Sequence, residues 1–595
     1  MARTRRAEYV LWGLAFLLSS LLVQAFGQEN TSGDNPPSRV ARISALRGDV
    51  SFLRAGMDQW SQAALNFPAT TGDRIYTDKG ARAELEIGPY TARMWERTDL
   101  TITNLNDQIM QLGLGQGSIR LSVRELSSGE TVEVDTPNGA LTLVDQGKYR
   151  IDVDPDGDHT LVSVINGRLE VSGGGVSQTV DAGQAVKLMG HDSIQFESIP
   201  MPPPDTLDAW SEERDLRLGS ARSSKYVNPS TPGFDDLDEY GNWTEVAEYG
   251  PVWFPPVAVG WVPYRLGHWV WIDPWGWTWI EDEPWAFCPF HFGRWVLIGA
   301  HWGWLPGPFV MAPVYAPAFV AFLGGPGFSI GVGVGLVGWF PLGPTEPFFP
   351  WYHYGGNYLN VINVTNIRNV TNITNITNVT NISDVHYAYR TIATTAVPRD
   401  VFSSGQPVAH QAVRLNSQQL AKAQVIPHPA VNPTSRATLS GKPVRPPPVR
   451  AQRFAAASRT TESTSRSAPE SNRQPAPIVT KKAPPVGSAT LSSPPPPART
   501  QPSSRNAGGQ PRAESPRLIT KAPPPTPVVP FEQRRPPMLE HPGRALEPPQ
   551  LEDLQAGRPV RPMRDAEFPP HVPPLIRQGP VRASPAPRPV PPRPR

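Results

Sequence analysis

The chain contains a single cysteine, Cys288, among its 595 residues. One cysteine cannot form a disulfide within the chain, so a large apolar core must hold the fold together instead. Cys288 stands in the aromatic run Trp285-Ala286-Phe287-Cys288-Pro289-Phe290. We therefore expect it to be a small buried core residue.

Aromatic residues are scarce in the C-terminal third. No Trp or Tyr occurs from residue 397 to 595, whereas 44 of the 72 prolines lie there. A segment of this composition buries too little apolar surface to offset its chain entropy. It carries 29 Lys and Arg against 11 Asp and Glu, a net charge of +18, while the rest of the chain carries −16. We predict an acidic folded body followed by a basic, Pro/Arg-rich disordered tail.

Charged residues are missing from Trp295 to Thr345, a stretch long enough to be mistaken for a membrane span. Prolines such as Pro313, Pro326 and Pro341 interrupt it. Within it, residues 329–335 alternate Ile or Val with small residues, which is the periodicity of a β-strand. We predict a strand there and no transmembrane helix.

The N-terminus is typical of a secretion signal. Arg3, Arg5 and Arg6 precede the apolar run Val10–Val23, and Ala25-Phe26-Gly27 places small residues before Gln28. The apolar run is short for a membrane span, which needs ~20 residues. We predict a cleaved signal peptide and export to the periplasm or cell envelope. An uncleaved N-terminal anchor is the alternative.

Three copies of an aromatic unit recur at an interval of 26 residues. They are Gly241-Asn242-Trp243, Gly267-His268-Trp269 and Gly293-Arg294-Trp295. A fixed period of this length indicates a repeated supersecondary unit. In the second copy, strands at 269–272 and 277–280 flank Asp273-Pro274-Trp275-Gly276, which is typical of a hairpin turn. With a two-residue loop, Asp273 would pair with Gly276, and tryptophans would lie on both faces of the hairpin.

Residues 40–195 read as one short strand after another. Alternating runs such as 82–87 and 149–153 are separated by turn signals, among them Asp156-Gly157 and Asn166-Gly167. After this region, Asp205 can cap a short helix that ends near Ser220. We predict a mainly β protein.

Several motifs of this first region carry a resemblance to a known family. Leu46-Arg47-Gly48-Asp49-Val50, Gly72-Asp73-Arg74-Ile75-Tyr76-Thr77, Gly147-Lys148-Tyr149-Arg150-Ile151 and Val164-Ile165-Asn166-Gly167 occur in this order. They resemble the FecR family, whose periplasmic β domain is best known from a ferric dicitrate sensor that signals to a sigma factor. Only nine residues precede the apolar run, which leaves no room for a sigma-binding segment. The resemblance therefore implies the fold and an envelope location, without the sigma-regulatory mechanism.

The region from Asp205 to Pro344 resembles an uncharacterised Trp-rich domain that often follows FecR-type domains in Gram-negative bacteria. Tyr249-Gly250-Pro251-Val252-Trp253, Trp275-Gly276-Trp277-Thr278-Trp279 and Gly338-Trp339-Phe340-Pro341 carry this likeness. We divide the chain into a signal peptide (1–27), a FecR-like β domain (40–195), a linker with a short helix (196–235), a Trp-rich β-hairpin repeat domain (236–345), an Asn-Ile/Val-Thr triplet tract (357–384) and the tail (397–595).

Two roles are open for the repeat tryptophans. They can form the core, because small hairpins need such anchors. Alternatively, an exposed row of indoles can bind sugar rings or quaternary amines. The candidate ligand-binding residues are Trp243, Trp269, Trp271, Trp277, Trp279, Trp295, Trp302 and Trp304. His268, His291, His301 and Cys288 match no zinc spacing, so we expect no metal.

Asparagine recurs at every third position from Asn360 to Asn381. This period fits neither a strand nor an α-helix, and the β-branched residues between the asparagines oppose a helix. We expect an extended segment.

No catalytic set or phosphate loop emerges, so we expect neither enzymatic activity nor a cofactor. The leading hypothesis is a non-catalytic envelope protein used for binding or scaffolding. The alternatives are an envelope sensor anchored by an uncleaved N-terminal helix, and a glycan-binding protein that uses exposed tryptophan rows. Envelope proteins or glycans are the expected partners, the basic tail is a spacer or an adhesive for anionic envelope polymers, and export argues against nucleic acid. Membrane contact is expected only if the N-terminal helix stays uncleaved, and the sequence does not indicate an oligomeric state.

Overall fold

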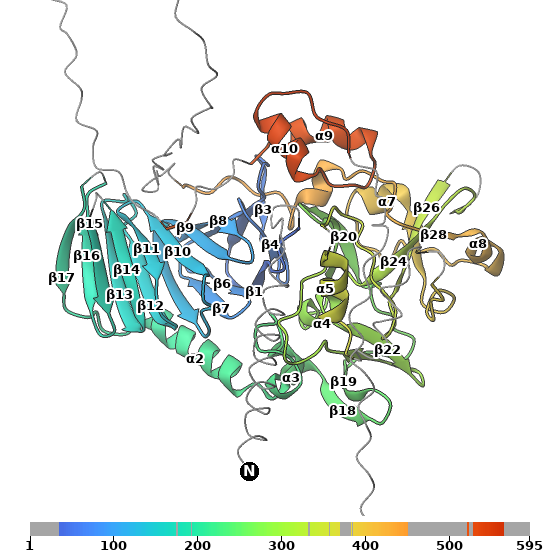
Figure 1. Cartoon of the computed structure of the whole chain (residues 1–595), viewed down its shortest axis with the longest axis horizontal. Coiled ribbons are helices and arrows are strands. Elements are labelled where there is room, and N and C mark those ends of the chain that lie inside the picture. The colour runs from blue at the N-terminus through green and yellow to red at the C-terminus, as the bar shows by residue number, and fades with distance from the viewer. Residues whose placement is uncertain are drawn as a thin grey trace, which may run out of the picture.

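The computed structural model describes residues 35–563, apart from 174–175, 192, 331–333, 356, 369–381, 383–384, 450–520 and 523–527. The predicted signal peptide lies outside the described residues. Strands dominate both halves of the folded body, which confirms the prediction of a mainly β protein (Figure 1). No helix in the described ranges has the length and apolar character needed to cross a membrane.

Seventeen strands form the first domain as two sheets that share strand β9. The first sheet has the order β4 (Pro68–Ala69), β1 (Ala41–Arg47), β6 (Arg82–Ile87), β7 (Tyr90–Met94), the second half of β9 (Ile109–Val123), β12 (Gly147–Val153), β13 (His159–Asn166), β16 (Ala185–Met189) and β17 (Gln195–Ile199). The second has the order β3 (Trp60–Gln62), β2 (Val50–Leu53), β5 (Arg74–Thr77), β8 (Asp99–Leu105), the first half of β9, β10 (Thr131–Thr136), β11 (Gly139–Leu143), β14 (Arg168–Gly173) and β15 (Val176–Asp181). Neighbours are antiparallel except β9 and β10, which run parallel.

Strand β9 passes from one sheet to the other at Gly117. This glycine has φ of +87°, and a Cβ atom there would lie 2.5 Å from Cα of Thr98. Only glycine fits such a position, since the left-handed backbone and the close approach both exclude a side chain. Alternate residues of the strands point inward, among them Leu85, Leu112, Val134 and Ile151, and all are buried. The apolar alternation read from the sequence thus makes the core.

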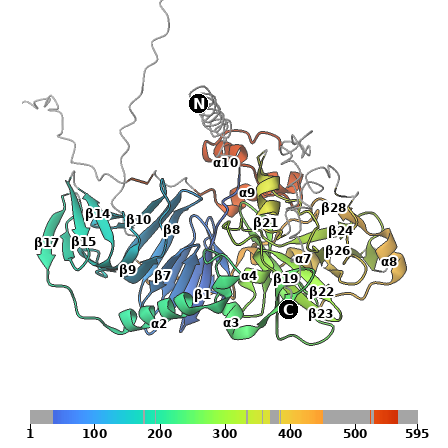
Figure 2. The same cartoon turned by 60° about the horizontal axis from the view of Figure 1, so that its bottom comes forward.

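Helix α2 (Thr206–Ser220) begins where the sequence predicts. The carboxylate of Asp205 accepts hydrogen bonds from the backbone N–H groups of Leu207 and Asp208, and the Asp208 side chain bonds back to the Asp205 N–H. This reciprocal pair is a capping box, which satisfies N–H groups that the first helical turn leaves free. Figures 1 and 2 show that α2 crosses the first sheet and leads toward α3 (Asp236–Tyr240), with the short 3-10 helix η1 (Arg222–Lys225) between.

Each of the three Gly-x-Trp units starts a β-hairpin, as predicted. The hairpins are β18 (Asn242–Val246) with β19 (Gly250–Phe254), β20 (Gly267–Ile272) with β21 (Gly276–Glu281), and β22 (Arg294–Ile298) with β23 (His301–Leu305). The first and third hairpins join through β19 and β23 into one sheet of four strands, whereas the second forms a separate sheet of two. The helix α4 (Phe287–His291) links the second hairpin to the third.

The register of the second hairpin differs from the prediction by one residue. Ile272, not Asp273, pairs with Gly276, so the loop has three residues rather than two. Gly276 has φ of +73°, a conformation that glycine adopts readily and that closes this longer loop. Trp269 therefore lies opposite Trp279, and Trp271 opposite Trp277. All four indoles share one face, and the prediction of tryptophans on both faces is wrong.

A third sheet completes the Trp-rich domain. It contains β24 (Val320–Gly324), β25 (Ser329–Ile330), β26 (Val334–Pro341), β27 (Thr395–Pro398) and β28 (Gln424–Ile426). The prediction of one strand over 329–335 is wrong, because Ile330 pairs with Val334 and the chain reverses between them. The glycines that make the alternation also permit a turn, so periodicity alone could not distinguish the two.

The start of the asparagine tract is helical, which corrects the prediction of an extended segment. Helix α5 spans Tyr358–Val364. The side-chain amide of Asn363 donates to the carbonyl groups of Phe348 and Leu359. A spacing of three places Asn363 and Asn366 near one face of a helix, where both are buried and hydrogen-bonded. Residues 369–381 lie outside the described residues.

The predicted tail is ordered over two long stretches. Residues 395–449 contain β27, α7 (Arg399–Ser403), α8 (Ser417–Lys422), β28 and η4 (Ser435–Thr438), and residues 528–563 contain α9 (Phe531–Glu540) and α10 (Pro548–Gln555). The prediction of a disordered tail from residue 397 is therefore wrong for these residues. The composition did not predict these ordered stretches, because their large apolar residues are few. Those residues, such as Phe402 and Phe531, are buried against the folded body. Apart from residues 521–522, the rest of the tail lies outside the described residues.

Candidate functional site: the tryptophan core and the charged junction

The structure buries seven of the eight tryptophans that were candidates for ligand binding. Trp269 and Trp271 lie on β20, Trp277 and Trp279 on β21, Trp295 on β22, and Trp302 and Trp304 on β23, and all seven are buried. Trp243 on β18 is half-buried, and its indole N–H donates to the Ser223 hydroxyl at 2.8 Å. Its ring centroid lies 4.6 Å from that of Tyr226.

The four indoles of the second hairpin pack against each other and against later parts of the chain. The Trp269–Trp279 and Trp271–Trp277 ring centroids are each 5.4 Å apart and nearly perpendicular. The ring centroid of Phe402 in α7 lies 4.5 Å from that of Trp277. The Trp277 indole N–H donates to the carbonyl of Val431. Residues 399–440, together with Phe322, Trp339 and Trp351, thus cover the face that the sequence analysis considered as an exposed aromatic platform. The hypothesis of an exposed tryptophan row is wrong for this hairpin, and these residues form core.

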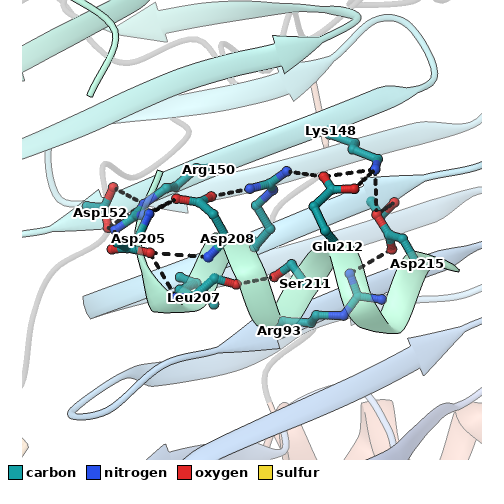
Figure 3. Close-up of polar contacts among 12 residues, drawn as sticks. Arg93, Lys148, Arg150, Asp152, Asp205, Leu207, Asp208, Ser211, Glu212 and Asp215 are labelled. Carbon is teal, nitrogen blue, oxygen red and sulfur yellow. Dashed lines mark hydrogen bonds and ion pairs between the residues drawn. The ribbon is translucent and has the colours of Figure 1, made fainter. Parts of the chain in front are cut away.

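Helix α2 is bound to the first domain by charged side chains as well as by the buried apolar residues Leu207, Trp210 and Leu218. Figure 3 shows Arg150 of β12 beside Asp208 and Lys148 beside Glu212. Arg120 of β9 also pairs with Asp208, and the Lys148–Glu212 pair measures 2.7 Å. The N-cap Asp205 also pairs with Arg150, at 2.8 Å. The aspartate that caps the helix therefore also fixes it to the sheet.

Glu84 on β6 is the most deeply buried carboxylate of this interface. It accepts hydrogen bonds from Arg93 at 2.5 Å and from Arg214 of α2 at 2.5 Å, and its side chain is fully inaccessible. Burial alone would raise the pKa of Glu84, but the two guanidinium groups outweigh it and lower the pKa to about 2. Arg93 also pairs with Asp215 of α2 at 2.7 Å, so a connected series of ion pairs joins β6, β7 and α2.

A second group of charges joins the two domains directly. Arg42 of β1 pairs with Glu86 of β6 at 3.0 Å and also with Asp236, the first residue of α3 in the Trp-rich domain. Arg217, near the end of α2, binds Asp235 at 2.8 Å and Asp236 at 2.5 Å. Burial opposes the charge on Arg42, but Asp236 and Glu86 outweigh it and raise the pKa of Arg42. We call Arg42, Glu86, Arg217, Asp235 and Asp236 the charged junction.

Buried ion pairs of this kind fix geometry more than they add stability. Taking charges out of water costs several kcal/mol per ion, and the mutual attraction repays it only when the partners are well placed. Removing one partner of such a pair costs about 3–5 kcal/mol, since it leaves the other charge buried alone. The charged junction therefore favours one relative placement of the two domains.

C-terminal segments connect the domains a second time. Residues 442–444 add to the edge strand β3: the Gln62 N–H donates to the Lys442 carbonyl at 2.8 Å, and the Val444 N–H donates to the Trp60 carbonyl at 2.9 Å. At α9, the Phe531 N–H donates to the Gly56 carbonyl, and Arg534 pairs with Asp273 in the loop of the second hairpin. Figure 1 shows α9 and α10 beside both domains.

Sequence reasoning found the helix at 205–220 but not the charges that the fold gathers around it. Arg42, Glu84 and Asp236 are far apart in the chain, and the strand pattern gives no sign that they meet. The one signal in the sequence was the presence of charged residues at alternate positions of a strand, such as Glu84 and Glu86 in β6. In the described ranges, no group of three or more His, Cys, Asp or Glu residues is placed to hold a metal. Cys288 is buried and unpaired, and burial raises the pKa of its thiol.

Two family models match the chain. Residues 73–170 match the FecR protein family, and residues 234–346 match a family of unknown function (DUF6600). The first match lies within the two-sheet domain, and the second covers α3, the three hairpins and β24–β26. The chain thus contains a FecR domain followed by an uncharacterised Trp-rich domain, as the sequence motifs indicate.

Two crystal structures of a protein provisionally described as an anti-sigma factor, from Parabacteroides distasonis, are similar to part of the chain. They are 15% and 14% identical, with TM-scores of 0.19 and 0.20. The matches cover 21% and 24% of this chain and 60% and 64% of those chains, less than two thirds of either relative. No curated protein matches the chain.

Proposed function

We propose that this protein is a non-catalytic component of the cell envelope, exported by its N-terminal signal, in which the FecR domain and the Trp-rich domain act as one rigid scaffolding or binding unit. The charged junction is the observation that carries this proposal, because it ties β1 and β6 of one domain to α3 of the other through buried ion pairs. The match to the FecR family supports the envelope location.

The burial of the repeat tryptophans also supports a structural role for the second domain. Ten of its indoles have at most 1% of their surface exposed, among them Trp253, Trp285 and Trp339. Indoles packed edge-to-face at this density gain about 0.5–1.5 kcal/mol per pair beyond area burial. Such a core suits a rigid support whose partners bind elsewhere on its surface.

Fractionation of native cells, combined with N-terminal sequencing, tests the location. We expect the protein in the periplasmic or outer envelope fraction, with a first residue near Gln28. A protein that keeps residues 1–25 and sediments with the inner membrane would support the anchored sensor instead. A protein found in the cytosol would contradict both.

Crosslinking in intact cells tests the scaffolding role. A photoreactive residue in place of exposed Val259 or Val310 should capture other envelope components. The same residue in place of Asp158, on the hairpin tip of the FecR domain, compares the two domains. A protein that captures no partner from any of the three positions would contradict a scaffolding role.

A further inference from the structure

A cavity of about 350 Å³ lies beside the third hairpin of the Trp-rich domain. Its lining includes Glu248, Tyr249, Arg294, Leu305, Thr345 and Arg368. This volume falls in the range of small-molecule sites, which are about 300–1,000 Å³. Neither the charged junction nor the tryptophan core uses this cavity.

Arg294 reaches the cavity because of its place in the repeat. It is the middle residue of the third Gly-x-Trp unit and the first residue of β22, where it pairs with Leu305. The equivalent positions in the first two units hold Asn242, which is exposed, and His268, which is half-buried. Gly293 before it has φ of +67°, and a Cβ atom there would lie 2.2 Å from the Leu305 carbonyl oxygen. The third repeat therefore has an arginine at the position where the first repeat has an asparagine and the second a histidine.

The Arg294 guanidinium is buried, and its hydrogen-bond partners are neutral. It is 1% exposed, and it donates to the carbonyls of Gly293 and Glu346 and to the side-chain oxygen of Asn363. These bonds use three of its five N–H groups. Its central carbon lies 4.1 Å from the ring centre of Phe319. Within the described part of the chain, no carboxylate lies in ion-pair contact with it.

Other deeply buried arginines of this protein do have carboxylate partners. Arg42, Arg93 and Arg120 each pair with at least one Asp or Glu. Near Arg294 the closest candidate is Glu346, but its carboxylate accepts the N–H groups of Gly343 and Ala388, both at 2.7 Å. Burial lowers the pKa of Arg294 to about 9, so the group remains protonated at neutral pH. A buried cation next to an open cavity thus has no carboxylate in ion-pair contact within the described residues, and the charge of Glu346 acts on it only from a greater distance.

We propose that this cavity binds a small organic monocarboxylate, whose carboxyl group pairs with the Arg294 guanidinium. The planar guanidinium fork matches a carboxylate with two parallel hydrogen bonds. Tyr249 and Leu305 provide aromatic and apolar walls for the body of the ligand, and Arg368 adds a second positive charge. With Glu248, the charged groups of the lining sum to +1, which matches one carboxylate better than a ligand with more negative charge. This proposal does not depend on the location of the protein or on its scaffolding role.

Isothermal titration calorimetry on the exported chain (residues 28–595) tests the proposal with benzoate as the probe. Benzamide has nearly the same shape without the charge, so we expect it to bind at least tenfold more weakly. Arg294→Gln should weaken benzoate binding at least tenfold. Thr345→Trp should do the same by filling the cavity, and because Thr345 is exposed we expect this variant to fold. Arg265→Gln is the matched control, because Arg265 donates to Thr395 and the Thr394 carbonyl outside the cavity.

Three results would overturn the proposal: no heat of binding with benzoate, equal binding of benzamide, or benzoate binding that survives Thr345→Trp. Sulfate that binds as tightly as benzoate and competes with it would also overturn it, since the site would then bind inorganic anions. If Arg294→Gln does not fold, as judged by thermal unfolding, the Thr345→Trp result decides.

Discussion

At the scale of single residues, Asp135 and Glu133 on β10 form a buried pair of carboxyl groups. Gln111 donates to both, at 2.7 Å to Asp135 and 3.2 Å to Glu133. Glu133 also accepts the Thr142 hydroxyl and the Lys521 backbone N–H, both at 3.0 Å. Burial, and then the charge of Glu133, raise the pKa of Asp135 to about 8. At neutral pH the folded protein therefore holds a proton on Asp135.

This proton predicts how stability changes with pH. An unfolded aspartate loses its proton near pH 4, whereas folded Asp135 keeps it to about pH 8. Between these values the folded state binds more protons, so the contribution of Asp135 to stability falls as pH rises from 4 to 8. Asp135→Asn should remove this loss and stabilise the protein at pH 9 by up to about 5 kcal/mol, with little effect near pH 4.

Urea unfolding of the wild type and Asp135→Asn at pH 4, 7 and 9 measures this difference. Asp158→Asn, at an exposed hairpin position of the same domain, is the control and should leave stability unchanged at each pH. A variant whose gain does not grow between pH 4 and pH 9 would show that Asp135 is ionised in the folded protein.

At the scale of elements, α2 depends on Glu84 for its attachment to the first sheet. We predict that Glu84→Gln lowers the free energy of unfolding by about 3–5 kcal/mol, because Arg93 and Arg214 lose their shared buried partner. The stability that Glu84 provides should disappear as pH falls from about 4.5 toward 2, since its folded pKa is depressed to about 2. Glu213→Gln, on the exposed side of α2, is the matched control. Denaturant unfolding measures both, and equal stability of the two variants would contradict this role of Glu84.

The segment around α7 should be as important to the second hairpin as the hairpin's own residues. Phe402→Ala removes a ring that packs on Trp277 and Trp269, at 4.5 and 5.5 Å, and should cost about 3–5 kcal/mol. Tryptophan fluorescence should shift to longer wavelength as water reaches these indoles. Phe309→Ala, at a half-exposed position of the same domain, should change neither quantity. Unchanged fluorescence and stability in Phe402→Ala would mean that residues 399–440 do not cover the hairpin.

These elements also show what the sequence could and could not predict. The cap at Asp205 is local, since both halves of the capping box lie within four residues, and it was predicted correctly. The hairpins follow from repeated local patterns, but the register at Ile272 and Gly276 depends on loop length, which the pattern does not determine. Phe402 belongs to a segment with few apolar residues, and its place depends on distant partners, namely the indoles that it covers and strand β24, with which β28 pairs. Arg294 could be noticed only as the charge directly before the uncharged stretch 295–345, because its missing counter-ion is a property of the folded domain.

At the scale of the whole molecule, the FecR domain and the Trp-rich domain are joined at several places, among them hydrogen bonds from Asn66 to the carbonyls of Glu283 and Pro284. The charged junction links β1 to α3, and the segments at 442–444 and 531–534 link β3 and its neighbouring turn to the C-terminal part of the chain. Several separated connections restrict rotation more strongly than one. The two domains should therefore keep one relative placement in solution, as the proposed scaffold requires.

The distance between two spin labels, measured by pulsed electron paramagnetic resonance, tests this claim most directly. Asp158→Cys on the FecR domain and Val310→Cys, 87% exposed on the Trp-rich domain, provide the labelling positions, while native Cys288 is buried. Rigid coupling predicts one narrow distance distribution, which should broaden when Arg42→Gln removes the central cation of the charged junction. A broad or two-peaked distribution in the protein with native Arg42 would contradict the account.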